Sequence, residues 1–200
     1  RNFHGYETSR GSTYNAFLIL ADKVTLVDTV KPGFYGEMMA RIRSIIDPSE
    51  IKYVVSNHSE LDHSGALPLL ANELNFEKIV ASPKGVEALN EHFDWDVEVQ
   101  TVKTGDKLSL GNKTLGFVET RMLHWPDSMF AFLEDEGVLF SNDAFGMHLA
   151  TAERFADELD PWLLKREGAK YYANILLHLS PVVQRLLDKL PDYNLDIKMI

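Results

Sequence analysis

Residues 54–65 read VVSNHSELDHSG, and this stretch is the most informative part of the chain for both fold and site. A β-rich segment, Ile51–Ser56, runs into a loop that carries, within six positions, four side chains able to bind a metal: His58, Glu60, Asp62 and His63. A small-residue turn and a helix-like segment follow at once. A loop at the carboxyl end of a buried strand can direct several side chains into one crevice, where open α/β sheets generally place their sites.

The rest of the chain alternates strand-like and helix-like segments. Alternating or β-rich apolar runs predict eight strands, at Asn15–Leu20, Lys23–Val30, Ile51–Ser56, Lys78–Ala81, Val97–Val102, Lys113–Thr120, Met129–Phe132 and Val138–Phe140. Helical spacing predicts five helices, at Gly36–Ile46, Ser64–Leu74, Pro83–Phe93, Pro161–Leu179 and Pro181–Leu190. This alternation indicates an α/β or mixed α+β fold, and 200 residues fit one domain.

The composition limits the kinds of site and partner. The chain has no cysteine, which excludes disulfides, thiolate zinc sites, iron–sulfur ligation and a cysteine nucleophile. Any metal must therefore be held by histidine and carboxylate. A formal net charge of -10 opposes binding to polyanions, so we do not expect a nucleic-acid partner. The longest apolar runs, Ala16–Ala21 and Ile175–Leu179, are too short to span a bilayer, so we expect no membrane insertion and a cytoplasmic protein.

Two further candidate ligands occupy similar positions along the chain. His124 follows the predicted strand Lys113–Thr120, and Asp143 comes just after Val138–Phe140. Six such groups are too many for one ion that must also keep an open position, so the sequence predicts two ions. An aspartate such as Asp143 can lend one oxygen to each metal of a pair that lies roughly 3.5 to 4 Å apart.

The same loop has a simpler interpretation. A lone histidine in a loop is more often solvated or hydrogen-bonded than a metal ligand. The acidic hexamer could also cap the following helix, with Asp62 or Ser64 accepting backbone N–H bonds. The clustering of four ligand types in six positions favours the metal site.

Three motifs together resemble the flavodiiron proteins. They are His-x-Glu-x-Asp-His at 58–63, Leu-His-Trp-Pro-Asp-Ser-Met at 123–129 and Ser-Asn-Asp-Ala-Phe-Gly at 141–146. That family is a subgroup of the metallo-β-lactamase superfamily in which Glu replaces the second His of a His-x-His-x-Asp-His motif. The resemblance extends from residues 6–16 to residues 171–175. It implies an α+β, metallo-β-lactamase-like four-layer αβ/βα sandwich with the site at one edge.

The resemblance also implies a role for each candidate ligand. One iron would be held by His58, Glu60 and His124, and the other by Asp62 and His63, with Asp143 bridging. In this family the residue that matches His63 can also swing off the metal and be replaced by water, and the sequence leaves that open. The family's last His ligand would fall a few residues beyond Ile200, after a strand-like run at Leu195–Ile200.

The two ends of the sequence suggest a longer parent chain. The family's flavodoxin-like, FMN-binding domain has no counterpart in these 200 residues, and we identify no FMN site in them. We therefore expect residues 1–200 to be the diiron domain of a longer protein, trimmed at both ends. The alternative is a variant whose second iron lacks one ligand.

The implied function is the reduction of dioxygen to water, of nitric oxide to nitrous oxide, or of both, at two non-haem irons. Electrons would come through FMN from the partner subunit of a head-to-tail homodimer, with rubredoxin or a similar carrier as donor. A carboxylate at Glu60 favours iron over zinc, because it is a harder donor than imidazole. A binuclear zinc hydrolase and a diiron dioxygen-binding sensor remain as alternatives, and the preferred gas is left open.

Aromatic residues near the motifs offer candidate catalytic groups. Tyr171 is the candidate catalytic residue, since a phenol there or at Tyr172 could hydrogen-bond a bound oxygen species, and Trp125 is a second candidate neighbour of the site. Packing in the core is the alternative role for these rings. His148 lies close in sequence to Asp143 and could line the substrate pocket or play a structural part.

Overall fold

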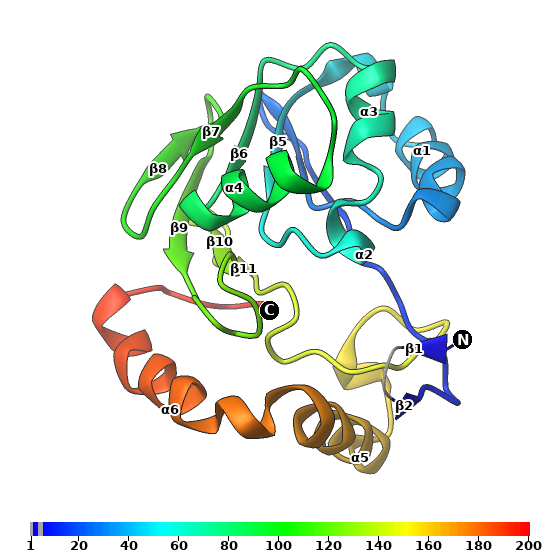
Figure 1. The fold of residues 1–200 in the computed structure, drawn as a ribbon, viewed down its shortest axis with the longest axis vertical. Helices are drawn as coiled ribbons and strands as arrows, with labels where there is room; N and C mark the ends of the chain where they lie inside the picture. The colour runs from blue at the N-terminus through cyan, green and yellow to red at the C-terminus, as the bar shows by residue number, and fades with distance from the viewer. Residues whose placement is uncertain (1, 4–5) are drawn as a thin grey trace.

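Two β-sheets form the centre of the molecule in this computed structural model, which describes residues 2–3 and 6–200 (Figure 1). The first sheet has the strand order β3 (Phe17–Ile19), β4 (Val24–Val27), β5 (Ile51–Ser56), β6 (Lys78–Ala81) and β7 (Val99–Thr101). The second has the order β11 (Val138–Phe140), β10 (Met129–Leu133), β9 (Thr114–Glu119) and β8 (Lys107–Ser109). A small hairpin pairs β1 (Asn2–Phe3) with β2 (Tyr6–Glu7).

The direction of the strands differs between the sheets. Strands β4, β5, β6 and β7 run parallel, and β3 joins them antiparallel at one edge. The second sheet is wholly antiparallel. Because β4, β5 and β6 are parallel neighbours, the loops that leave their carboxyl ends meet at one edge of the sheet.

Six α-helices accompany the sheets over the described part of the chain: α1 (Tyr35–Arg43), α2 (Leu61–Ser64), α3 (Leu67–Glu73), α4 (Pro83–His92), α5 (Pro161–Tyr171) and α6 (Ser180–Lys189). Short helical turns lie at η1 (Pro32–Phe34), η2 (Pro48–Glu50), η3 (Ala156–Glu158), η4 (Tyr172–Leu176), η5 (Leu177–Leu179) and η6 (Leu190–Tyr193). Ser82 begins α4, because its side chain accepts a hydrogen bond from the Gly85 N–H and Pro83 follows it. No described helix has both the length and the apolar character needed to cross a membrane.

Side chains alternate between the two faces of each strand, and the buried apolar residues form three clusters, each between two neighbouring layers. Val27 and Val55 point between the two sheets, where they meet Leu115 and Phe117 of β9. Their neighbours Leu26 and Val54 point outward, toward the buried side chains of α1, α3 and α4. On the far side, Phe130, Phe132 and Leu139 of the second sheet contact Leu186 of α6. The order helix, sheet, sheet, helix confirms the four-layer αβ/βα sandwich, and Figure 1 shows α5 and α6 set apart from the other helices.

Most predicted elements are confirmed, some with shifted ends. Strands β5, β6 and β11 have the predicted bounds, whereas the prediction missed β8, a three-residue edge strand between two glycine turns. The predicted helix Pro161–Leu179 is α5 continued by a π-helical turn, η4, and then η5. The strand predicted at Leu195–Ile200 is wrong, because this segment makes only an isolated bridge between Met199 and Val138. Its apolar residues Leu195 and Ile197 instead cover the outer face of the second sheet.

Candidate metal centre

The loop after β5 is held in place by hydrogen bonds to segments of both sheets. The Asn57 N–H donates to Asp28 Oδ1 at the end of β4 (2.7 Å), and the Asn57 carbonyl accepts from the Met129 N–H of β10 (3.0 Å). Further along, the His63 carbonyl accepts from the Thr29 N–H (2.8 Å). The next residue after Asn57, His58, is fully buried. The first four candidate ligands therefore lie on a fixed backbone.

Four of the candidate ligands converge on one point. His58 Nε2 lies 3.3 Å from Glu60 Oε2 and 3.5 Å from Asp143 Oδ2. His124 Nε2 lies 3.3 Å from the same Glu60 oxygen and 3.1 Å from the same Asp143 oxygen. Ligands about 2.1 Å from one ion are separated by about 3.0 Å in an octahedron and about 3.4 Å in a tetrahedron. The four atoms are thus spaced like ligands of a single cation.

The other two candidate ligands lie on the opposite side of Asp143. His63 Nε2 is 3.0 Å from Asp143 Oδ1 and 3.8 Å from Asp62 Oδ1. Asp62 Oδ1 is buried and has no hydrogen-bond partner among the described residues, as expected of an oxygen that awaits a cation. All six predicted ligands are therefore brought together. Asp143 directs Oδ2 toward His58, Glu60 and His124, and Oδ1 toward the side of His63 and Asp62.

The helix-capping interpretation of this loop is wrong. Glu60 occupies the N-cap position of α2 and Ala66 that of α3, and neither helix has a side-chain cap hydrogen bond. The Ser64 hydroxyl is instead a donor, to the Ser59 carbonyl at 2.7 Å. The acidic side chains of the loop remain available for the convergent cluster.

The electrostatics of the cluster favour bound positive charge. Burial lowers the pKa of His58, but hydrogen bonds with Asp127 and Glu60 outweigh it and raise this pKa to about 10. Burial likewise lowers the pKa of His124, and hydrogen bonds with Asp143 and Glu60 raise it to about 9. Burial raises the pKa of Glu60, but the two imidazoles bring it down to about 2. The pKa of Asp143 is held well below its usual range by the same kind of contact. The carboxylates therefore attract cations, whether protons or metal ions.

Backbone conformations around the cluster carry strain. Asp28, Met122, Asn142 and Phe145 all have φ between 54° and 68°, in the left-handed region. Such residues cost of order 1–3 kcal/mol each and gather at functional sites. Met122 and Asn142 lie close in sequence to the candidate ligands His124 and Asp143, so the strain lies in the two loops that carry these residues from the second sheet.

The aromatic candidates lie around the cluster. The Trp125 ring meets the His58 ring edge-on, with centroids 5.2 Å apart. Tyr171 is 6% exposed and packs against the His148 ring at 5.2 Å. Burial lowers the pKa of His148, and the carboxylates of Asp143 and Asp62 oppose this shift. His148 therefore contacts the Tyr171 ring and lies within electrostatic reach of Asp143 and Asp62.

An apolar cavity of about 300 Å³ adjoins the loop that follows Asp143. It is lined mainly by Phe130, Ala144, Phe145, Tyr171, Leu176 and Leu186. Among the remaining histidines, His92 Nδ1 donates to the Ser59 carbonyl (3.2 Å) and His178 is exposed, whereas His4 lies outside the described residues.

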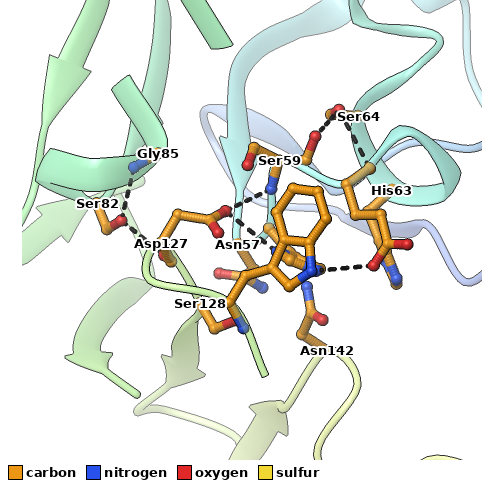
Figure 2. Close-up of polar contacts among 12 residues, drawn as sticks. Asn57, Ser59, His63, Ser64, Ser82, Gly85, Asp127, Ser128 and Asn142 are labelled. Carbon is orange, nitrogen blue, oxygen red and sulfur yellow. Dashed lines mark hydrogen bonds and ion pairs between the residues drawn. The ribbon is translucent and has the colours of Figure 1, made fainter. Parts of the chain in front are cut away.

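Sequence reasoning missed two buried carboxylates beside the site. Asp28 accepts from Asn57, and Asp127 reaches His58 Nδ1 (3.1 Å) and the Ser59 N–H (2.6 Å), as Figure 2 shows for the Ser59 contact. Asp127 belongs to the motif Leu-His-Trp-Pro-Asp-Ser-Met at 123–129, two residues before β10. That position was the only signal of its role.

Comparisons with known proteins agree with this geometry. A family model described as "ODP family beta lactamase" matches residues 13–200. A nitric oxide reductase of Moorella thermoacetica is 44% identical over 203 residues, which cover 100% of this chain and 51% of that protein. The structure of rubredoxin oxygen:oxidoreductase from Desulfovibrio gigas has a TM-score of 0.96 and 46% identity, covering 100% of this chain and 50% of that one. A flavodiiron protein from Giardia intestinalis has a TM-score of 0.91 and 35% identity, covering 98% and 48%. The chain spans about half the length of the curated relatives it matches.

Proposed function

This chain belongs to the ODP family of beta-lactamase-like domains, and on that premise we propose that it is the diiron domain of an enzyme that reduces dioxygen to water, nitric oxide to nitrous oxide, or both. The relatives support this proposal, since those described above are named a nitric oxide reductase, a rubredoxin oxygen:oxidoreductase and a flavodiiron protein.

The proposal depends above all on Glu60. Its carboxylate oxygen lies 3.3 Å from both His58 Nε2 and His124 Nε2, so it is aimed at the point where those imidazoles converge. A carboxylate in that position suits iron or manganese better than zinc and stabilises the oxidised state of the metal. Two ferrous ions held by these residues would supply one electron each to a substrate.

The proposed ligands fit two such ions. Glu60, Asp62 and Asp143 offset most of the charge of two ferrous ions, and three neutral imidazoles complete a set of intermediate hardness. Asp143 Oδ2 faces His124 and Oδ1 faces His63, an arrangement that suits a carboxylate bridging two metals.

Tyr171 is proposed as a catalytic group. Its ring is buried beside His148, on the wall of the apolar cavity that adjoins the Asp143 loop. A phenol in this position would donate a hydrogen bond to an oxygen-containing species as negative charge develops on it, and His148 would fix the ring.

Electron supply requires parts beyond those described. We propose that FMN delivers the electrons, that it belongs to the partner subunit of a head-to-tail homodimer, and that rubredoxin or a similar carrier reduces it. In this proposal residues 1–200 act as one domain of a longer protein. A ferrous site is most easily maintained in a reducing compartment, so we place the protein in the cytoplasm.

Two other functions make different predictions. A binuclear zinc hydrolase would contain zinc after purification in the presence of both metals, and a dioxygen sensor would bind the gas without consuming it. Glu60 disfavours the hydrolase, because imidazole at this position would suit zinc better.

The decisive experiment uses the full-length protein, purified without oxygen and reduced with dithionite. We expect about two irons per chain by metal analysis, and consumption of dioxygen or formation of nitrous oxide in anaerobic stopped-flow mixing with each gas. Stoichiometric zinc would indicate the hydrolase, and tight dioxygen binding without turnover would indicate the sensor.

A further inference from the structure

Asp127 connects a proposed metal ligand to the scaffold through a single carboxylate oxygen. Its side chain is buried, and Oδ2 accepts hydrogen bonds from both the Ser59 N–H (2.6 Å) and His58 Nδ1 (3.1 Å). Ser59 lies between His58 and Glu60 in the chain. The same oxygen therefore fixes the ring of one proposed ligand and the backbone that leads to the next.

The contact with Nδ1 determines which nitrogen of His58 faces the site. A neutral imidazole carries one proton, and a carboxylate at Nδ1 keeps the proton there. The lone pair is then on Nε2, which lies 3.3 Å from Glu60 Oε2 and 3.5 Å from Asp143 Oδ2. The contact thus orients the ring with Nε2 toward the site, and loss of the Nε2 proton leaves the tautomer that can bind a metal there.

Asp127 is itself held by the start of α4. The Ser82 hydroxyl donates to the Asp127 carbonyl (2.6 Å) and accepts from the Gly85 N–H (3.0 Å), and Figure 2 shows this pair of contacts on the side of Asp127 away from Ser59. Pro126 precedes Asp127 and restricts the backbone there. The N-cap of a helix therefore anchors the group that orients His58.

The negative charge of Asp127 is directed mainly at His58. Its other oxygen, Oδ1, is buried without a hydrogen-bond partner among the described residues, and the one ion pair found for Asp127 over that part of the chain is with His58. A carboxylate in this arrangement makes the imidazole a stronger electron donor to a metal.

We infer that Asp127 is a positioning residue that holds His58 as an Nε2 ligand and strengthens its bond to the metal on that side of Asp143. This inference rests on the proposed diiron function for the identity of the metal. It assigns Asp127 a selective effect on one of the two metal positions, the one shared by His58, Glu60 and His124.

The test compares Asp127→Asn and Asp127→Ala with the unchanged protein, in the full-length chain. Asparagine keeps an acceptor for the Ser59 N–H but removes the charge, whereas alanine removes both. Ferrous ion is titrated anaerobically against a chelator, and Mössbauer spectra resolve the two irons. We expect Asp127→Asn to bind the His58-side iron about tenfold more weakly and Asp127→Ala about a hundredfold more weakly, while the other iron is little affected. The reduction potential of the affected iron should rise.

Asp28→Asn is the matched control. Asp28 is also a buried carboxylate that anchors this loop, through the Asn57 N–H, but it makes no hydrogen bond to an imidazole among the described residues. We expect this variant not to weaken the His58-side iron selectively. The inference is overturned if Asp28→Asn reproduces the selective loss, or if the Asp127 variants weaken both irons equally or neither. If the unchanged protein binds two irons but reduces neither gas, the proposed function fails while the role of Asp127 is still tested.

Discussion

His63 Nε2 lies 3.0 Å from Oδ1 of Asp143, whereas the contacts of His58 and His124 with this carboxylate are to Oδ2. The second oxygen, Oδ2, lies 3.1 Å from His124 Nε2. A single aspartate after β11 therefore contributes to two groups of ligands at once. This relationship makes Asp143 the first residue to test.

Replacing Asp143 with alanine should remove both metal ions. Without the carboxylate, each ion loses one ligand and the charge that offsets repulsion between the two cations. We expect iron content to fall from about two per chain to well below one, measured after anaerobic purification. Asp62→Ala is the matched control, because Asp62 lies only on the His63 side and should cost one iron. Full iron occupancy in Asp143→Ala would contradict the bridging role.

Replacing Glu60 with histidine should change the choice of metal. The variant has the His-x-His-x-Asp-His spelling, and imidazole is a softer donor than carboxylate. We expect the ratio of bound iron to bound zinc to fall several-fold when both metals are supplied in equal amounts, measured by elemental analysis. Glu60→Asp keeps the carboxylate and should keep the preference for iron. An unchanged ratio in the histidine variant would show that another feature selects the metal.

The sequence was most predictive where chemistry and periodicity coincide. Strands β5, β6 and β11 consist mainly of apolar residues bounded by polar loops, and their predicted bounds are those observed. The six candidate ligands could be grouped because four of them lie within six positions and the other two follow strands. The loop after β5 leaves the carboxyl edge of the parallel strands, whereas His124 and Asp143 follow β9 and β11, which are both antiparallel to β10 and so end at one edge of the second sheet.

Other features depend on contacts that periodicity does not encode. Leu195–Ile200 alternates like a strand, yet it covers the outer face of the second sheet and makes only one bridge, at Met199. Strand β8 has one apolar residue, Leu108, between two exposed polar residues, which gives no apolar run to detect. Asp127 and Asp28 act through hydrogen bonds across separations of 69 and 29 residues, which a single sequence does not reveal.

The layer between the sheets should dominate stability. Leu115 of β9 is fully buried there, and replacing it with alanine removes apolar contacts and leaves a cavity. We expect the free energy of unfolding to fall by about 2–5 kcal/mol in urea titrations. Leu69→Ala on α3 is the control, because Leu69 is 41% exposed, and it should cost less than about 1 kcal/mol. Equal losses would contradict the assignment of the core.

Removing the hydroxyl of Tyr171 should slow turnover without loss of metal. Phenylalanine keeps the ring that packs against His148 but cannot donate a proton or hydrogen bond. We expect Tyr171→Phe to keep about two irons and to reduce kcat by about tenfold or more, in stopped-flow assays with each gas. Tyr172→Phe is the matched control, since the Tyr172 hydroxyl is engaged with Ser180 Oγ at 2.9 Å. Unchanged kcat in Tyr171→Phe would limit Tyr171 to packing.

Metal affinity should rise with pH, because the metal must displace protons. In the metal-free protein the pKa of His58 is raised to about 10 and that of His124 to about 9, so both are protonated at neutral pH. Displacing two protons should raise the apparent affinity for ferrous ion by up to about a hundredfold per pH unit below pH 9. Anaerobic titrations at several pH values, with an indicator dye for released protons, measure both effects.

The stability of the metal-free protein should change with pH in the opposite direction. Because the folded-state pKa of each imidazole lies above its unfolded value of 6.5, protonation stabilises the folded state fully below pH 6.5, and this stabilisation is lost as pH rises through about 9 to 10. The unfolding midpoint should therefore fall across this window without metal. With His124→Asn the metal displaces one proton instead of two. The apparent affinity for ferrous ion should then rise by up to about tenfold per pH unit instead of a hundredfold. An affinity for ferrous ion that is independent of pH would show that these imidazoles do not bind the metal.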